Sequence, residues 1–138
     1  MDVTPQSDAE ELALREIAGW NEHRPAAVTD LYAVDETYTD PTGTVHDRVS
    51  LAEYVETTVT AFPDLHVEPR AVVGREGTVA CRYTFGGTLE GPYRGFEPTG
   101  ESFELHGVAW SRVEDGAIAE AWNATDSTAM ARQLGLLG

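Results

Sequence analysis

The sequence contains no lysine, a single cysteine and no apolar run long enough to span a membrane. Its nine basic residues are all arginines, and they face 24 aspartates and glutamates, which gives a formal net charge of −15. Because phosphate groups repel such a charge, we expect neither a nucleic-acid partner nor a membrane partner. Cys81 has no second cysteine with which to form a disulfide, and the N-terminal residues lack the basic start and apolar segment of a signal peptide. We therefore expect a cytoplasmic protein.

The acidic composition also indicates the conditions in which the protein works. Dense carboxylates without lysine resemble the surfaces of proteins from salt-loving archaea. At 1 M salt the Debye length is about 3 Å, so carboxylates that crowd a surface repel one another little. The charge therefore predicts a halophilic protein and says little about its function.

Helical patterning dominates the first part of the sequence. Ser7, followed three residues later by Glu10, is the signature of an N-terminal capping box, and Ser50 with Glu53 repeats it. Apolar residues follow each signature at helical spacing, namely Ala9, Leu12, Ala13, Ile17 and Trp20 after the first, and Val55, Val59 and Phe62 after the second. Pro25 suits the first turn of a short helix that we expect to extend to residue 32.

Strand patterning dominates the rest, after a short strand expected at residues 36–40. Residues 66–74 and 78–87 flank Glu76-Gly77, and residues 101–113 and 117–124 flank Asp115-Gly116. Both dipeptides favour hairpin turns. Helices followed by antiparallel hairpins predict an α+β fold in a single domain, residues 1–138, with the helices on one face of a curved sheet.

Three segments of the second half occur in an order that is similar to a known family. They are the run Gly-Pro-Tyr-Arg-Gly-Phe-Glu-Pro-Thr-Gly at 91–100, the hairpin at 113–122, and Asp126 with a short helix ending at 133–135. This order resembles the SnoaL-like polyketide cyclases, or ester cyclases, of the nuclear-transport-factor-2-like superfamily. The resemblance implies a cone-shaped, curved antiparallel sheet with helices on its concave face, an α+β barrel around a hydrophobic cavity.

The same resemblance identifies positions at which catalysis would be expected. Alternation along residues 103–113 puts Gly107 and Ala109 on one face of a strand. In the SnoaL-like cyclases the corresponding positions carry a Gln and a His that face the cavity, and the position of Asn123 carries the catalytic Asp. Asn123 can hold a carbonyl oxygen by hydrogen bonding, but an amide cannot carry a proton to and fro.

A second, local resemblance lies at residues 40–43. Asp40 opens an Asp-Pro-Thr-Gly sequence after a short strand, as in the ketosteroid isomerases, in which the Asp of Asp-Pro-x-Gly is the general base. The resemblance implies that Asp40 is the catalytic base, and an apolar cavity would raise its pKa above the reference value of about 3.9. The positions of that family's two oxyanion donors hold Glu16 and Ala109. Asp-Pro is also ordinary turn chemistry, which is the alternative role for Asp40.

Five other residues are candidates for ligand binding in such a cavity: Asn123, Tyr83, Trp20, His46 and Tyr93. Tyr83 and Asn123 share strand faces with small and apolar residues, so we expect both to point inward. Trp20 is alternatively a core residue, and His46 is alternatively a solvated loop residue near the cavity mouth. The histidines lack the close pairings of a metal site, so we expect no metal ion and no cofactor.

Three functions are open from the sequence. The chain is a cyclase or isomerase that acts on a small hydrophobic carbonyl compound with Asp40 as base, or it binds such a molecule without catalysis, or it is a dimeric domain whose side chains fill the cavity. The replaced acid–base positions favour the last two. Strand alternation puts three large side chains, those of His106, Trp110 and Trp122, on the outer face of neighbouring strands. So much apolar surface on one face predicts a homodimer through that face.

Overall fold

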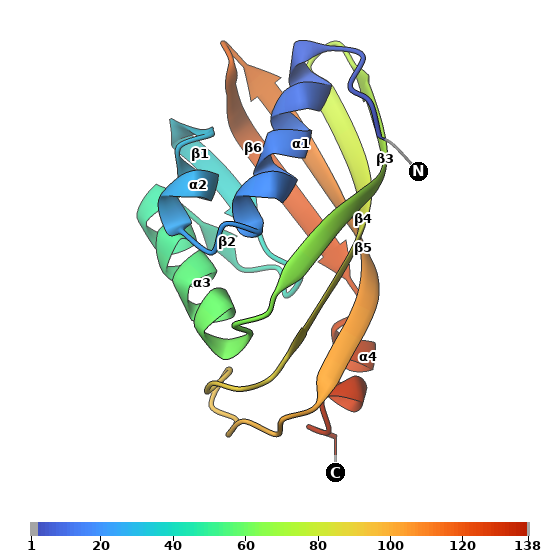
Figure 1. The fold of residues 1–138 in the computed structure, drawn as a ribbon. Coiled ribbons are helices and arrows are strands. Elements are labelled where there is room, and N and C mark those ends of the chain that lie inside the picture. Colours follow the sequence, from blue (N-terminus) through green and yellow to red (C-terminus); the bar gives the residue numbers. More distant parts are fainter. Residues whose placement is uncertain (1–2, 138) are drawn as a thin grey trace.

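The structure is a computed structural model, and it describes residues 3–137. Within that range the chain forms four α-helices, which are α1 (Asp8–Trp20), α2 (Pro25–Thr29), α3 (Arg48–Ala61) and α4 (Ser127–Gln133). The strands are β1 (Tyr32–Thr39), β2 (Val45–His46), β3 (His66–Arg75), β4 (Thr78–Thr88), β5 (Ser102–Glu114) and β6 (Ala117–Thr125). Figure 1 shows the long strands curving around α1, with α2 and α3 beside it and α4 near the N-terminal end of β5. The expected α+β fold is confirmed.

The described strands form one sheet in the order β2-β1-β6-β5-β4-β3. The pairs β3–β4, β4–β5 and β5–β6 are antiparallel, as the hairpin signals predicted. However, β1 pairs with β6 in parallel, so the expectation of an antiparallel sheet fails at this pair. Only a tight hairpin forces neighbouring strands to be antiparallel, and most of the chain separates β1 from β6.

The helix starts follow local capping signals, although not always the expected ones. The hydroxyl of Ser7 accepts a hydrogen bond from the backbone N–H of Glu10 at 3.1 Å, as predicted. The expected cap at Ser50 is wrong, because α3 begins earlier and Asp47 is its N-cap. The carboxylate of Asp47 accepts the backbone N–H of Ser50 at 2.8 Å. The Ser50 hydroxyl is therefore available for a different partner.

The short second helix ends sooner than expected. It stops at Thr29, and Tyr32 begins β1 instead of completing the helix. A single core-facing aromatic residue fits the periodicity of a helix and of a strand equally well. The sequence therefore could not show whether Tyr32 ends the helix or begins a strand. This shift matters for function because it turns the Tyr32 hydroxyl toward α1.

The core lies between the helices and the concave face of the sheet. α1 packs on β3 and β4, and α3 packs on β1. The most deeply buried side chains include those of Val28, Leu51, Val55, Phe62 and Leu134. Nowhere in residues 3–137 is there a helix long and apolar enough to cross a membrane.

Candidate active site

A cavity of about 200 Å³ opens between α1, α3 and the concave face of the sheet. Tyr83, Ala109 and Asn123 line it from the strands, and Glu16 and Tyr54 line it from the helices. Most of the remaining wall is apolar. A cavity of this kind holds a ligand by its apolar body and orients it through a few polar groups.

Glu16 places a carboxyl group in this wall. It lies on the buried face of α1, where only 5% of the residue is exposed. The hydroxyl of Tyr32 donates a hydrogen bond to Glu16 Oε1 at 2.9 Å. Burial raises the pKa of Glu16 to about 7, against the opposing effect of hydrogen bonding from Tyr32 and Trp20. A carboxyl group with such a pKa can accept and return a proton near neutral pH.

Tyr83 and Asn123 form a second polar group in the wall. The Tyr83 hydroxyl donates a hydrogen bond to Asn123 Oδ1 at 2.6 Å. Burial raises the pKa of Tyr83 above its usual value, so the phenol stays protonated and remains the donor. Because its carbonyl oxygen is occupied in this way, Asn123 has its amide N–H groups left to donate.

The ring of Tyr83 lies directly over Gly107 on the neighbouring strand. Gly107 and Tyr83 are paired in the β4–β5 register. A Cβ atom at Gly107 would sit 2.5 Å from Cζ of Tyr83, closer than any real contact. The glycine is therefore what allows Tyr83 to reach into the cavity. It occupies the position at which the cyclase resemblance places an inward-facing Gln.

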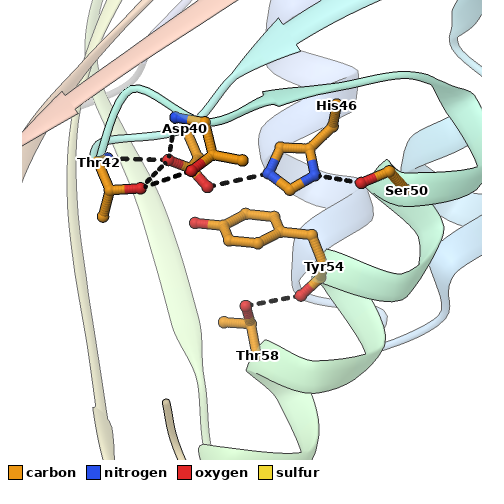
Figure 2. A network of polar contacts seen from close by, with 7 residues as sticks. Asp40, Thr42, His46, Ser50, Tyr54 and Thr58 are labelled. Atoms are coloured by element: carbon orange, nitrogen blue, oxygen red, sulfur yellow. Dashed lines mark hydrogen bonds and ion pairs between the residues drawn. The ribbon is translucent and has the colours of Figure 1, made fainter.

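Asp40 is buried within a dense set of hydrogen-bond donors, which Figure 2 shows. Asp40 Oδ1 accepts the backbone N–H of Thr42 at 2.8 Å, the Thr42 hydroxyl at 2.6 Å and the backbone N–H of Thr44 at 3.2 Å. Asp40 Oδ2 lies 2.9 Å from Nε2 of His46. The other ring nitrogen of His46, Nδ1, lies 2.6 Å from the hydroxyl oxygen of Ser50.

The expected rise in the pKa of Asp40 is wrong. Burial does raise it, but hydrogen bonds from His46, Thr42 and Thr44 outweigh that effect and lower the pKa below its ordinary value of 3.8. Asp40 is also not among the residues that line the cavity, although the following Pro41 and Thr42 are. The base role of Asp40 stays a prediction, and the turn chemistry that was its alternative is present.

The candidate ligand-binding residues divide into two groups. Asn123, Tyr83, Trp20 and Tyr93 all line the cavity. His46 does not line it and is not solvated either, because it is only 8% exposed. Its ring packs against Tyr54, with 4.9 Å between the ring centroids. The imidazole is thus separated from the cavity by the rings of Tyr54 and Tyr38, which both line it.

Sequence reasoning gave no role to Glu16, although the signal was present. Glu16 falls in the apolar stripe of α1, one residue before Ile17 and four before Trp20. A carboxyl group in the middle of such a stripe is expected to be buried. Two other cavity residues, Tyr54 and Arg94, had no comparable signal.

A further carboxyl group, that of Glu36 on β1, is buried without a partner. Glu36 is 3% exposed, and within residues 3–137 neither of its oxygens has a hydrogen-bond donor. Burial, together with the charge of Asp47, raises its pKa to about 7, while Arg48 opposes the shift. In the described part of the chain, no group of three or more His, Cys, Asp or Glu residues is placed to hold a metal ion.

Comparison with known proteins identifies the family and agrees with the fold. The profile of the SnoaL-like polyketide cyclase family matches residues 10–134, so the chain belongs to that family. No curated protein matches the chain.

Solved structures share the fold over nearly the whole chain. AclR, a proposed hydroxylase from Streptomyces galilaeus, is 25% identical, with a TM-score of 0.85 over 97% of this chain and 89% of AclR. IdmH, a proposed polyketide cyclase from Streptomyces antibioticus, is 28% identical, with a TM-score of 0.81 over 94% of this chain and 99% of IdmH. A protein of ketosteroid isomerase-like fold from Catenulispora acidiphila, solved with trimethylamine, is 21% identical, with a TM-score of 0.79 over 91% and 93% of the two chains. This last likeness concerns the fold alone.

Proposed function

We propose that the chain binds a small hydrophobic molecule with a carbonyl group in its cavity and transfers a proton on that molecule, as a cyclase or an isomerase does. One observation carries this proposal, the Glu16 carboxyl group in the cavity wall with a pKa raised to about 7. Structural carboxylates are normally paired or exposed, and a raised pKa in a cavity is typical of a working acid–base group.

The proposed reaction uses Glu16 and Asn123 in different roles. The ionised Glu16 removes a proton from the carbon next to the ligand's carbonyl group, and the C–H electron pair moves to the carbonyl oxygen as an enolate forms. The amide N–H groups of Asn123 donate to that oxygen, which carries more charge in the transition state than in the ketone. Protonated Glu16 then returns the proton to carbon.

The cavity limits the size of the ligand. A volume of about 200 Å³ lies below the range of roughly 300 to 1,000 Å³ that is usual for ligand pockets. We therefore expect a ligand with one or two rings. The rings of Trp20 and Tyr54, which meet edge to face at 6.0 Å, offer an aromatic surface on which such a molecule can pack.

Deuterium exchange into 2-tetralone, a bicyclic ketone with an acidic carbon next to its carbonyl group, tests the proposal. The wild-type protein should accelerate the exchange seen by NMR in D₂O, and the rate should rise with an apparent pKa of about 7 as Glu16 ionises. Glu16→Gln should remove at least about 100-fold of that acceleration, the usual minimum for a general base. Glu11→Gln, an exposed change on the same helix with the same effect on net charge, is the control.

The alternative is a receptor that binds without catalysis. The Gly107 and Ala109 positions favour it, because the resemblance places acid–base side chains there and this chain has none. In that case the wild-type protein would bind 2-tetralone without accelerating its exchange. The exchange rates with the wild type and with Glu16→Gln would then both equal the solvent background.

We also propose a homodimer through the outer face of the sheet. Trp110 and Trp122 are register partners on β5 and β6, and Trp122 is 49% exposed. Val108, on the same strand face as Trp110, is 47% exposed, so the face presents several apolar groups to solvent. Sedimentation at high salt should give a dimer for the wild-type chain and a monomer for Trp122→Glu. A wild-type monomer would contradict the proposal.

A further inference from the structure

Arg94 gives the cavity mouth a positive charge. Among the described residues that line the cavity, Arg94 is the only arginine, and the chain has no lysine. It lies at the tip of a tight turn in which Tyr93 and Phe96 exchange two backbone hydrogen bonds, of 3.1 and 2.8 Å. Tyr93 and Phe96 line the cavity as well, so the turn as a whole forms part of its wall.

Arg94 makes no ion pair with any residue in the range 3–137, even though the chain is rich in carboxylates. Four arginines, Arg24, Arg48, Arg70 and Arg112, form such pairs, whereas Arg94 shares the lack of one with Arg15, Arg75, Arg82 and Arg132 among the described residues; of these five, Arg94 is the one that lines the cavity. The guanidinium of Arg94 instead lies 5.4 Å from the centroid of the Tyr93 ring. Its N–H groups are thus not committed to a carboxylate of the chain.

The backbone at Arg94 has an unfavourable conformation for its residue type. Its φ is +50°, and the following Gly95 also has a positive φ of +82°. In a two-residue turn of this type, Asn, Asp or Gly is preferred at the first position. Glu76 adopts a similar φ of +52° in the β3–β4 turn, so the conformation alone does not indicate function. At Arg94 it sets the side chain beside the cavity.

We propose that the ligand of the cavity is a carboxylate, an aromatic acid of one or two rings whose charged group binds Arg94 at the mouth while its rings enter the apolar interior. This inference rests on the proposed function, since it names the substrate class of the same site. The planar guanidinium matches a carboxylate in a two-point hydrogen bond. A net charge of −15 repels anions from the surface at low salt, and a positive group at the mouth offsets that repulsion where the ligand enters.

The test compares two probes that differ in charge and not in shape. 2-Naphthoate and 2-naphthamide share the bicyclic ring and the carbonyl group, and only the first is an anion. Their affinities are measured by fluorescence titration with the wild-type chain, Arg94→Gln, Arg94→Lys and Arg75→Gln. The last variant is the matched control. It removes Arg75, an exposed arginine that ends β3, and changes the net charge by the same amount.

The two probes should respond differently. Arg94→Gln should lower the affinity for 2-naphthoate about tenfold. This loss is at the low end for a hydrogen bond to a charged group, because the site is partly exposed. It should change the affinity for 2-naphthamide less than about twofold, and Arg94→Lys should recover part of the loss. Arg75→Gln should leave both affinities within about twofold of the wild type. Titrations use the lowest salt at which every variant keeps the wild-type circular dichroism spectrum.

Two different failures are distinguishable. If 2-naphthamide binds and Arg94→Gln changes both probes equally, or neither, the carboxylate inference is wrong and the proposed function stands. If neither probe binds and the wild-type chain also fails to exchange 2-tetralone, both proposals are wrong.

Discussion

Glu16 and Asp40 expose similarly small fractions of their surface, 5% and 4%, although Glu16 lies deeper in the molecule, and their pKa values move in opposite directions. Glu16 has a pKa raised to about 7, and Asp40 has a pKa below its ordinary value. Asp40 accepts hydrogen bonds from two backbone N–H groups, a hydroxyl and an imidazole, whereas the donors to Glu16 are the side chains of Tyr32 and Trp20 alone. The larger supply of donors, together with its shallower burial, lowers the pKa of Asp40, while deep burial raises that of Glu16.

Local structure explains the difference in donors. Asp40 follows the last residue of β1 and begins a turn, where the backbone N–H groups of Thr42 and Thr44 donate hydrogen bonds to its side chain. Glu16 lies in the middle of a helix, where every nearby backbone N–H is already bonded within the helix. A carboxylate in a turn is therefore stabilised by its own segment, and one inside a helix depends on distant side chains.

Substituting Asp40 should have the largest destabilising effect. Asp40→Asn puts either an N–H₂ group or a neutral oxygen among donors that now bind a carboxylate, and it leaves the ring of the buried His46 without its carboxylate hydrogen-bond partner. We expect the free energy of unfolding in urea at pH 8 to fall by about 3 kcal/mol. Asp35→Asn, an exposed change on the same strand, should change it by less than about 0.5 kcal/mol. An equal effect of the two substitutions would contradict the donor argument.

Substituting Glu16 should change stability in the opposite direction. The folded pKa of about 7 exceeds the ordinary value of 4.5, so the folded state loses stability relative to the unfolded chain as pH rises from 4.5 to 7, and no further above that. Glu16→Gln removes this loss. We expect the variant to match the wild type near pH 4.5 and to be more stable by about 3 kcal/mol at pH 8. Thermal and urea unfolding over this pH range measure the difference, and a constant gap would be evidence against it.

Glu36 offers a smaller version of the same effect. It also has a raised pKa of about 7, and its oxygens have no donors within the described residues. Because Glu36 lies less deep in the molecule than Glu16, Glu36→Gln should raise the free energy of unfolding by only about 1 kcal/mol at pH 8, and by much less below pH 4.5. Glu53→Gln on the outer side of α3 provides the control. A loss of stability in Glu36→Gln would mean that the carboxylate has a partner after all.

Salt should act on the surface and leave the contrast between the buried groups unchanged. Removing salt exposes 24 acidic residues to unscreened repulsion, against nine arginines, so the melting temperature should fall by several degrees between molar and millimolar salt. The two variants should still change the free energy of unfolding in opposite directions, Asp40→Asn lowering it and Glu16→Gln raising it, because salt screens buried interactions much less than surface ones. An unchanged melting temperature would refute the surface effect.

Much of the fold could be predicted because strand alternation is a local property. The inward faces of β4, β5 and β6 follow from parity, and Tyr83, Ala109 and Asn123 do line the cavity. The parallel pairing of β1 with β6 could not be predicted, because it joins segments distant in sequence. The prediction that the pKa of Asp40 is raised was wrong for a related reason. Its turn was recognised, but the His46 contact depends on β2 folding back beside β1.

The seat of the Tyr83 ring over Gly107 constrains how this cavity can evolve or be redesigned. A Cβ atom at position 107 would lie 2.5 Å from the ring, so a side chain there requires Tyr83 to turn away from its present place. Restoring the glutamine that the cyclase resemblance places at 107 would therefore displace Tyr83 from the cavity wall, and with it the hydrogen bond to Asn123. Positions 107, 83 and 123 are thus coupled, and a change at the first alters the polar groups that the other two present to a ligand.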